Sequence, residues 1–116
     1  MIMTGGFYRR GLNLLLGSWA ENFLRNVRVN KAFIGVDAID IRDGVFNATM
    51  EEASIKKIIV EVSKEVILVA DHSKFGRIAL AKICELDRIH KIITDSGLEM
   101  SYQNALKNMS VNLSLV

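Results

Sequence analysis

The sequence has a single cysteine, no long apolar run and almost no net charge. One cysteine, Cys84, excludes an intramolecular disulfide and any zinc site built from several cysteines. The longest unbroken apolar stretch, residues 66–70, is far shorter than the roughly 18 residues that cross a bilayer. The N-terminal segment also lacks the apolar core of a signal peptide. We therefore expect a reduced, soluble protein of the cytoplasm.

The charge balance argues against nucleic-acid binding by this chain. Lys and Arg number 15 and Asp and Glu number 13, which gives a net charge of +2. No more than two cations are adjacent anywhere, whereas nucleic-acid-binding modules carry a clustered basic face. The pattern of a recognition helix preceded by a short turn is missing as well. We expect no specific DNA binding by these residues, and no membrane partner.

What the sequence does contain is enough apolar material for the core of one small domain. Half of the 116 residues are hydrophobic, as in ordinary globular chains. Two capping-box patterns, Ser18 with Glu21 and Thr49 with Glu52, each precede apolar residues at helical spacing. These patterns predict the starts of two helices, and a third helix is expected over residues 100–109.

Short apolar runs between these helices predict strands. The run at 66–70 is continuous, which is typical of a strand buried on both faces of a parallel sheet, and residues 91–94 repeat the design. Further strands are expected at residues 1–4, 32–36 and 111–116, and a polar loop containing glycine is expected at 44–47. Helices that alternate with apolar strands predict a layered α/β fold with a mostly parallel sheet.

Three of the expected strands end at an aspartate. Asp37, Asp71 and Asp95 follow the strands at 32–36, 66–70 and 91–94. Ligands of open parallel sheets bind beyond the carboxyl ends of the strands, so three carboxylates there outline a polar pocket. The alternative is that each carboxylate accepts hydrogen bonds from the first amides of the turn that follows it. The sequence leaves both interpretations open.

Lysines near this edge favour a phosphorylated ligand. Lys56 lies at the border of its helix's apolar stripe and can reach a pocket, whereas Lys57 should face water; a solvated position on the helix flank is the alternative for Lys56. The segment 70–77 places Asp71 and Lys74 in one loop. Lysine supplies charge for a phosphate, and aspartate accepts hydrogen bonds from sugar hydroxyls.

The remaining reactive side chains do not form a recognisable centre. Neither His72 nor His90 has a second ligand at metal-binding spacing, and no nucleophile elbow surrounds Ser73 or Cys84. We therefore predict no metal site and no hydrolase triad, and we interpret Cys84 as a small buried apolar residue.

Three stretches of the chain resemble the C-terminal sensor domain of DeoR-type transcriptional regulators: KAFIGVD at 31–37, EEASIKK at 51–57 and DHSKFG at 71–76. Members of that family bind phosphorylated sugars or related metabolites and thereby control a winged helix-turn-helix. The resemblance implies effector sensing by a repressor, without a cofactor, in a homo-oligomer. It implies that the ligand is held by Asp37, Lys56, Asp71 and Lys74.

The same resemblance implies the fold of ribose-phosphate isomerases and CoA-transferase-like proteins (NagB/RpiA-like), incomplete at the N-terminus. Residues 1–116 would be the C-terminal part of the sensor domain, without the helix-turn-helix and without the Gly/Ser/Thr-rich phosphate loop of its first half. Ala38 stands where the family usually has glycine. Surface uncovered by the missing half is expected to drive self-association.

An enzyme is the main alternative to a sensor. The resemblance extends to sugar-phosphate isomerases, which carry one carboxylate shortly before the strand-end aspartate and another just before the helix lysine. Here Ile34 and Ile55 stand at those positions. Because aldose–ketose isomerisation needs a base to move a proton between carbons, we predict binding without catalysis. A second alternative is an oligomerisation module that binds no ligand.

Overall fold

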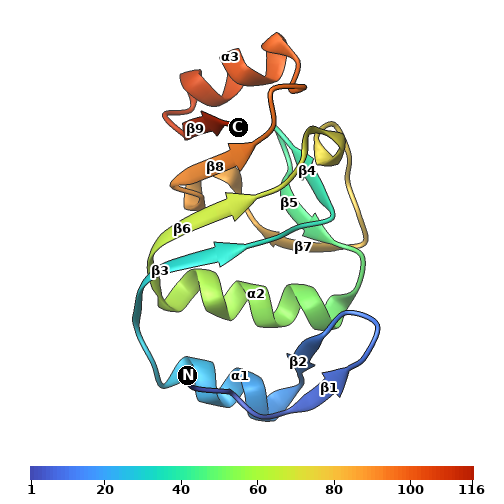
Figure 1. Ribbon diagram of the computed structural model, residues 1–116, viewed down its shortest axis with the longest axis vertical. Coiled ribbons are helices and arrows are strands. Elements are labelled where there is room, and N and C mark those ends of the chain that lie inside the picture. Colours follow the sequence, from blue (N-terminus) through green and yellow to red (C-terminus); the bar gives the residue numbers. More distant parts are fainter.

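A four-stranded parallel sheet runs through the middle of the molecule (Figure 1). The computed structural model describes residues 1–116. The strand order is β3-β6-β8-β9, and every neighbouring pair is parallel. The strands are β3 (Val29–Ile34), β6 (Ser63–Val69), β8 (Lys91–Thr94) and β9 (Asn112–Leu115). The predicted α/β class with a parallel sheet is confirmed.

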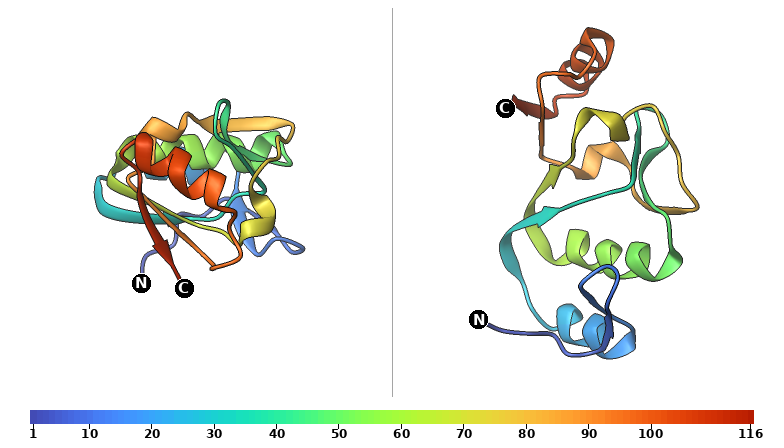
Figure 2. Two further views of the ribbon diagram at one scale, coloured as in Figure 1. Left: turned by 90° about the horizontal axis from the view of Figure 1, so that it is seen from above. Right: turned by 45° about the vertical axis from the view of Figure 1, so that its right-hand side comes forward.

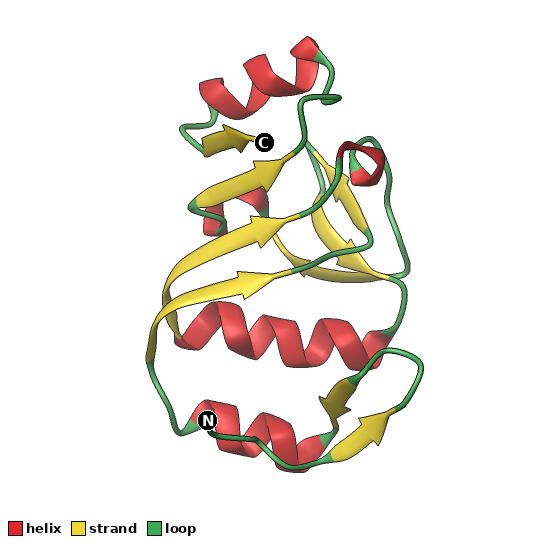
Figure 3. Cartoon of the chain, in the orientation of Figure 1, coloured by secondary structure: helices red, strands yellow, loops and turns green.

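Two helices lie in successive layers below this sheet, as Figure 3 shows in red. The longer helix, α2 (Met50–Val62), packs between the sheet and α1 (Ser18–Arg25). The third helix, α3 (Met100–Asn108), connects β8 to β9. All three predicted helices are therefore present, in the predicted order.

The two predicted helix caps differ in outcome. Thr49 is the N-cap of α2, and its hydroxyl accepts a hydrogen bond from the amide of Glu52 at 3.2 Å. The cap expected at Ser18 is wrong, because Ser18 is already helical and Gly17 occupies the N-cap position without a side-chain bond. Gly17 has a φ of 96°, a conformation that favours glycine over serine.

A second, antiparallel sheet packs beside the first, and the sequence did not predict it. Its strands are β4 (Ala38–Asp40), β5 (Gly44–Asn47) and β7 (Ala81–Cys84), in the order β4-β5-β7. The loop expected at 44–47 is thus a fully buried strand. The turn before it is closed by the carboxylate of Asp40, which accepts hydrogen bonds from the amides of Arg42 and Asp43.

Residues 1–4, expected as a strand, form no strand. Met1 to Met3 are exposed, and they pair with no strand. The first strands are instead a hairpin of β1 (Phe7–Arg9) and β2 (Leu14–Leu16). Figure 2 shows this hairpin and the N-terminus at the α1 end of the molecule, opposite the C-terminus.

The hydrophobic core fills the space between the parallel sheet, α2 and the antiparallel sheet. Its most deeply buried members include Ile39, Leu68 and Ile92, one from each of β4, β6 and β8. A smaller cluster of Leu16, Ala20 and Ile55 fastens the hairpin and α1 to the outer side of α2. The carboxyl ends of β3, β6 and β8 therefore open at one edge of a rigid, well-packed body.

Candidate functional site

The loops that follow β3, β6 and β8 meet at the carboxyl edge of the parallel sheet (Figure 1). Each loop begins at or near one of the three strand-end aspartates, Asp37, Asp71 and Asp95. Because the three strands are hydrogen-bonded neighbours in parallel register, their carboxylates share this edge. The three carboxylates differ in how many of their oxygens accept hydrogen bonds from the protein.

Asp37 is held by the segment that ends β5. Its backbone amide donates to the carbonyl of Phe46 at 3.0 Å. Its Oδ2 accepts hydrogen bonds from Asn47 Nδ2 at 2.9 Å and from the amide of Ala48 at 2.7 Å. The Asn47 bond is the main cause that lowers the pKa of Asp37, and the charges of Lys56 and Lys74 lower it further. The other oxygen, Oδ1, accepts no hydrogen bond from the protein.

Lys56 reaches from α2 to the loop after β3. Its ammonium group donates to the carbonyl of Gly35 at 2.6 Å, while the neighbouring Lys57 is exposed to solvent, as the helical spacing predicts. Burial lowers the pKa of Lys56, and the nearby charges of Glu52 and Asp37 oppose this shift. One bond to a carbonyl leaves the ammonium group with two further donors.

Asp71 and Lys74 belong to a short 3-10 turn, η1 (His72–Lys74), directly after β6. Asp71 Oδ1 accepts bonds from both the hydroxyl and the amide of Ser73, and these two bonds lower the pKa of Asp71. One oxygen of Asp71 therefore caps the turn, and the other is free. The side chain of Lys74 is half-buried and makes no hydrogen bond or ion pair, although its charge acts on both Asp37 and Asp71.

Asp95 has both of its oxygens occupied. Oδ1 accepts from the amide of His72 at 2.7 Å, and Oδ2 lies 2.7 Å from His72 Nδ1 and accepts from the amide of Gly97 at 3.1 Å. The bond from the His72 amide is the main cause that lowers the pKa of Asp95 to about 2. For Asp95 the structural alternative is correct: it binds the loop after β6 to the end of β8.

Sequence reasoning missed the roles of Asn47 and His72. The sequence predicts a polar loop at Asn47, but this residue is buried at the end of β5. The sequence suggests for His72 only a metal ligand or a triad member, yet it bonds to Asp95, which is 23 residues further along the chain. No local pattern signals this bond, because only the parallel pairing of β6 with β8 brings the two residues together.

The other reactive groups lie outside this edge. Burial raises the pKa of Cys84 to about 11, which keeps its thiol protonated at neutral pH. His90 lies at the opposite end of the parallel sheet, where its Nδ1 accepts a bond from the amide of Val66. No group of three potential metal ligands comes together in the structure.

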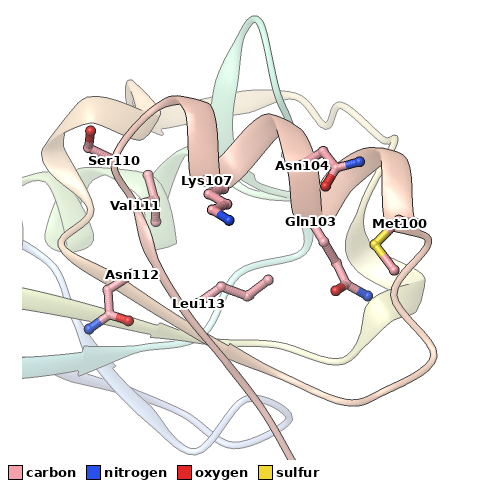
Figure 4. Close-up of a pocket in the computed structure, with 8 residues that line it drawn as sticks. All are labelled: Met100, Gln103, Asn104, Lys107, Ser110, Val111, Asn112 and Leu113. Atoms are coloured by element: carbon pink, nitrogen blue, oxygen red, sulfur yellow. The ribbon is translucent and has the colours of Figure 1, made fainter.

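The surface also has two hollows that none of the four predicted residues lines, although the second is lined by their neighbours His72 and Ser73. Figure 4 shows a pocket of about 590 Å³ between α3 and β9, whose only cationic side chain is Lys107. A second hollow, of about 410 Å³, lies between the η1 loop and the start of α3 and includes His72, Arg77 and Tyr102. Neither contains Asp37, Lys56, Asp71 or Lys74.

Comparison with known families identifies the family of the chain. The family model of the DeoR C-terminal sensor domain matches residues 1–96. The chain belongs to the DeoR sensor-domain family. The match includes all four predicted site residues and the bonded pair of His72 and Asp95.

Relatives of this sensor domain are named as transcriptional regulators. A putative aga operon transcriptional repressor of Escherichia coli O157:H7 is 38% identical over 116 residues, which are 100% of this chain and 43% of the relative. The HTH-type transcriptional regulator GlpR of Haloferax volcanii is 32% identical over 96% of this chain and 44% of its own length. The glycerol-3-phosphate regulon repressor of Haemophilus influenzae is 31% identical over 99% of this chain and 44% of its own length.

The chain spans less than half the length of each of these relatives. No helix of this sensor domain is long and apolar enough to cross a membrane. The part that it shares with these relatives is nearly the whole of the chain, including the loops at the carboxyl edge of the sheet.

Proposed function

We propose that this sensor domain binds a phosphorylated sugar or a related phosphorylated polyol at the carboxyl edge of its parallel sheet. The observation that carries the proposal is the arrangement of two lysines, Lys56 and Lys74, around two aspartates that each keep one oxygen free. In a longer cytoplasmic repressor, ligand binding here would control a DNA-binding segment outside these residues. Residues 1–116 would form the C-terminal part of the complete sensor domain.

The lysines and the aspartates would contact different ends of such a ligand. The ammonium groups of Lys56 and Lys74 can oppose a phosphate, since lysine acts as a mobile point charge. The free oxygens of Asp37 and Asp71 can accept hydrogen bonds from hydroxyl groups. The low pKa of both aspartates keeps them ionised, and therefore acceptors only, at neutral pH.

A sensor is favoured over an isomerase by the surroundings of two isoleucines. Ile34 is buried in the main core, and Ile55 is buried against the α1 layer with Leu16 and Ala20. At these positions the resemblance to sugar-phosphate isomerases implies carboxylates. Apolar side chains there supply no base for moving a proton between carbons. The two isoleucines therefore support ligand binding without turnover, on a fold that this domain would share with the isomerases.

We also propose that this sensor domain self-associates. Both β3 and β9 are edge strands of the parallel sheet, and edge strands offer unpaired backbone groups. Phe33 on β3 is 66% exposed, and Phe7 and Trp19 at the hairpin end are 82% and 78% exposed. Exposed apolar groups of this kind are common at protein interfaces. A light-scattering mass of one chain at working concentration would contradict self-association.

Isothermal titration calorimetry with a panel of triose, pentose and hexose phosphates tests the ligand proposal. At least one member should bind, and Lys74→Met should weaken that binding by about tenfold, the loss of one charge-assisted bond. Lys57→Met is the matched control, since it removes the same charge from an exposed position on α2. A folded chain that gives no heat with any member contradicts the sensor and favours the ligand-free oligomerisation module. Conversion of a sugar phosphate would favour the isomerase.

A further inference from the structure

Asp37 is bound on one side only, and all of its bonds on that side come from consecutive residues at the end of β5. Phe46 accepts from its amide, and Asn47 and Ala48 both donate to Oδ2. The antiparallel sheet holds these partners in place, because Asn47 pairs with Ala81 of β7. The direction of the Asp37 carboxylate is therefore set by a strand of the second sheet.

Asn47 is an unusual residue for its position. It is only 1% exposed and lies on a strand whose other residues are buried as well. Its Oδ1 is buried without a hydrogen-bond partner, which makes the amide costly to place there. The single side-chain bond that the amide makes is the one to Asp37 Oδ2. An apolar side chain would fit these buried surroundings better. The bond to Asp37 is therefore the one interaction for which an amide is needed at this position.

We propose that Asn47 is a positioning residue of the effector site, which holds Oδ2 of Asp37 so that Oδ1 faces a hydroxyl group of the ligand. This inference rests on the proposed function and adds the residue that orients the hydroxyl acceptor. With Oδ2 saturated by Asn47 and Ala48, Oδ1 is the only oxygen of Asp37 that can accept a hydroxyl without losing a protein bond. Asn47 itself does not touch the ligand.

The first test needs no ligand. In Asn47→Leu, the loss of the amide donor should raise the pKa of Asp37, measured from the carboxyl carbon by NMR titration. An unchanged pKa overturns the positioning role, whatever the chain binds. If Asn47→Leu does not fold, Asn47→Ala removes the same donor without adding bulk and serves in its place.

The second test compares ligands with and without hydroxyl groups. Glycerol 3-phosphate, ribose 5-phosphate and glucose 6-phosphate are each titrated into the wild type and Asn47→Leu, with inorganic phosphate as the reference. Asn47→Leu should weaken the best sugar or polyol phosphate by about tenfold and leave inorganic phosphate unchanged. Equal weakening of both indicates general damage and overturns the inference.

A double variant shows whether Asn47 affects ligand affinity through Asp37 or through packing. If Asn47 acts through Asp37, adding Asn47→Leu to Asp37→Ala should not weaken binding further, and a further loss of the same size overturns the inference. If the wild type binds none of the three organic phosphates more tightly than inorganic phosphate, hydroxyl recognition is overturned together with the proposed ligand class. The NMR titration still decides in that case whether Asn47 fixes Asp37.

Discussion

The ends of β3 and β8 carry the same residue type at the same edge of the sheet, yet the two aspartates serve different purposes. Asp95 uses both oxygens to bind His72 and Gly97, so it fastens one loop to another. Asp37 uses one oxygen on the second sheet and leaves the other free. The difference shows that the protein donors around a strand-end carboxylate, and not its place in the sequence, decide whether one of its oxygens stays free.

The largest expected effect comes from damage to the sheet that supports Asp37. Gly44 has a φ of 105°, and a Cβ there would lie 2.3 Å from the carbonyl oxygen of Cys84. Gly44→Ala should therefore lower the free energy of unfolding by at least the roughly 1–3 kcal/mol of backbone strain, measured by urea denaturation. The control is Gly11→Ala, because Gly11 has no atom within 4 Å of its Cβ position and no positive φ. Equal stability of the two variants would contradict this reading of the second sheet.

The two aspartates can be compared directly by truncation. Asp37→Ala should weaken sugar-phosphate binding by about tenfold or more, because it removes the proposed hydroxyl acceptor, and it should also lower the melting temperature, because the buried Asn47 amide loses its side-chain partner. Asp95→Ala should lower the melting temperature and weaken binding less, because it releases the loop after β6. Calorimetry and thermal unfolding on both variants measure the contrast. A larger loss of affinity in Asp95→Ala would reverse the assignment.

Asp95 should make the thermal stability of the chain depend on pH in the acidic range. Its pKa falls from an ordinary 3.8 to about 2 in the folded chain. A group with a lowered folded pKa stabilises the fold above its unfolded pKa, and that contribution is lost as the pH falls through the folded value. The melting temperature should therefore drop between about pH 4 and pH 2, and the drop should be smaller in Asp95→Ala. Identical pH profiles would show that Asp95 contributes nothing to acid stability.

The smallest expected effect is that of Gly97→Ala. A Cβ at Gly97 would lie 2.8 Å from His72 Nδ1 and 2.9 Å from Asp95 Oδ2. Both atoms are at the ends of side chains that can move, so the loss of stability should stay below about 1 kcal/mol. The His72 ring should nevertheless shift away from Asp95, which NMR of the imidazole nitrogens can follow. An unchanged imidazole spectrum would contradict the close packing of these three residues.

The parallel sheet and its helices could be predicted because their signals are local. Residues 66–70 form a continuous apolar run, and α2 carries apolar residues at helical spacing, so each pattern is visible within a short window. The loop order then places Asp37 and Asp71 at one edge. Whether they hold a ligand remains a prediction, because the geometry gives them free oxygens and the comparisons give only the family.

The antiparallel sheet could not be predicted, because its strands are short and include polar residues. Asp40 closes a turn and Asn47 bonds to Asp37, so neither strand shows the apolar alternation of an ordinary hairpin. The bond between His72 and Asp95 likewise depends on tertiary structure, since only the pairing of β6 with β8 brings the two residues together. In both cases a polar residue is explained by a partner that is distant in sequence.

The position of Lys56 on α2 has a mechanical consequence. Its neighbour Ile55 is buried against Leu16 and Ala20 of the outer layer, while Lys56 bonds to the carbonyl of Gly35 at the sheet edge. Adjacent residues of one helical turn thus contact the layer of α1 and the hairpin on one side and the edge of the sheet on the other. If the proposed ligand binds Lys56, it would therefore act directly on the helical turn that packs against α1 and the hairpin.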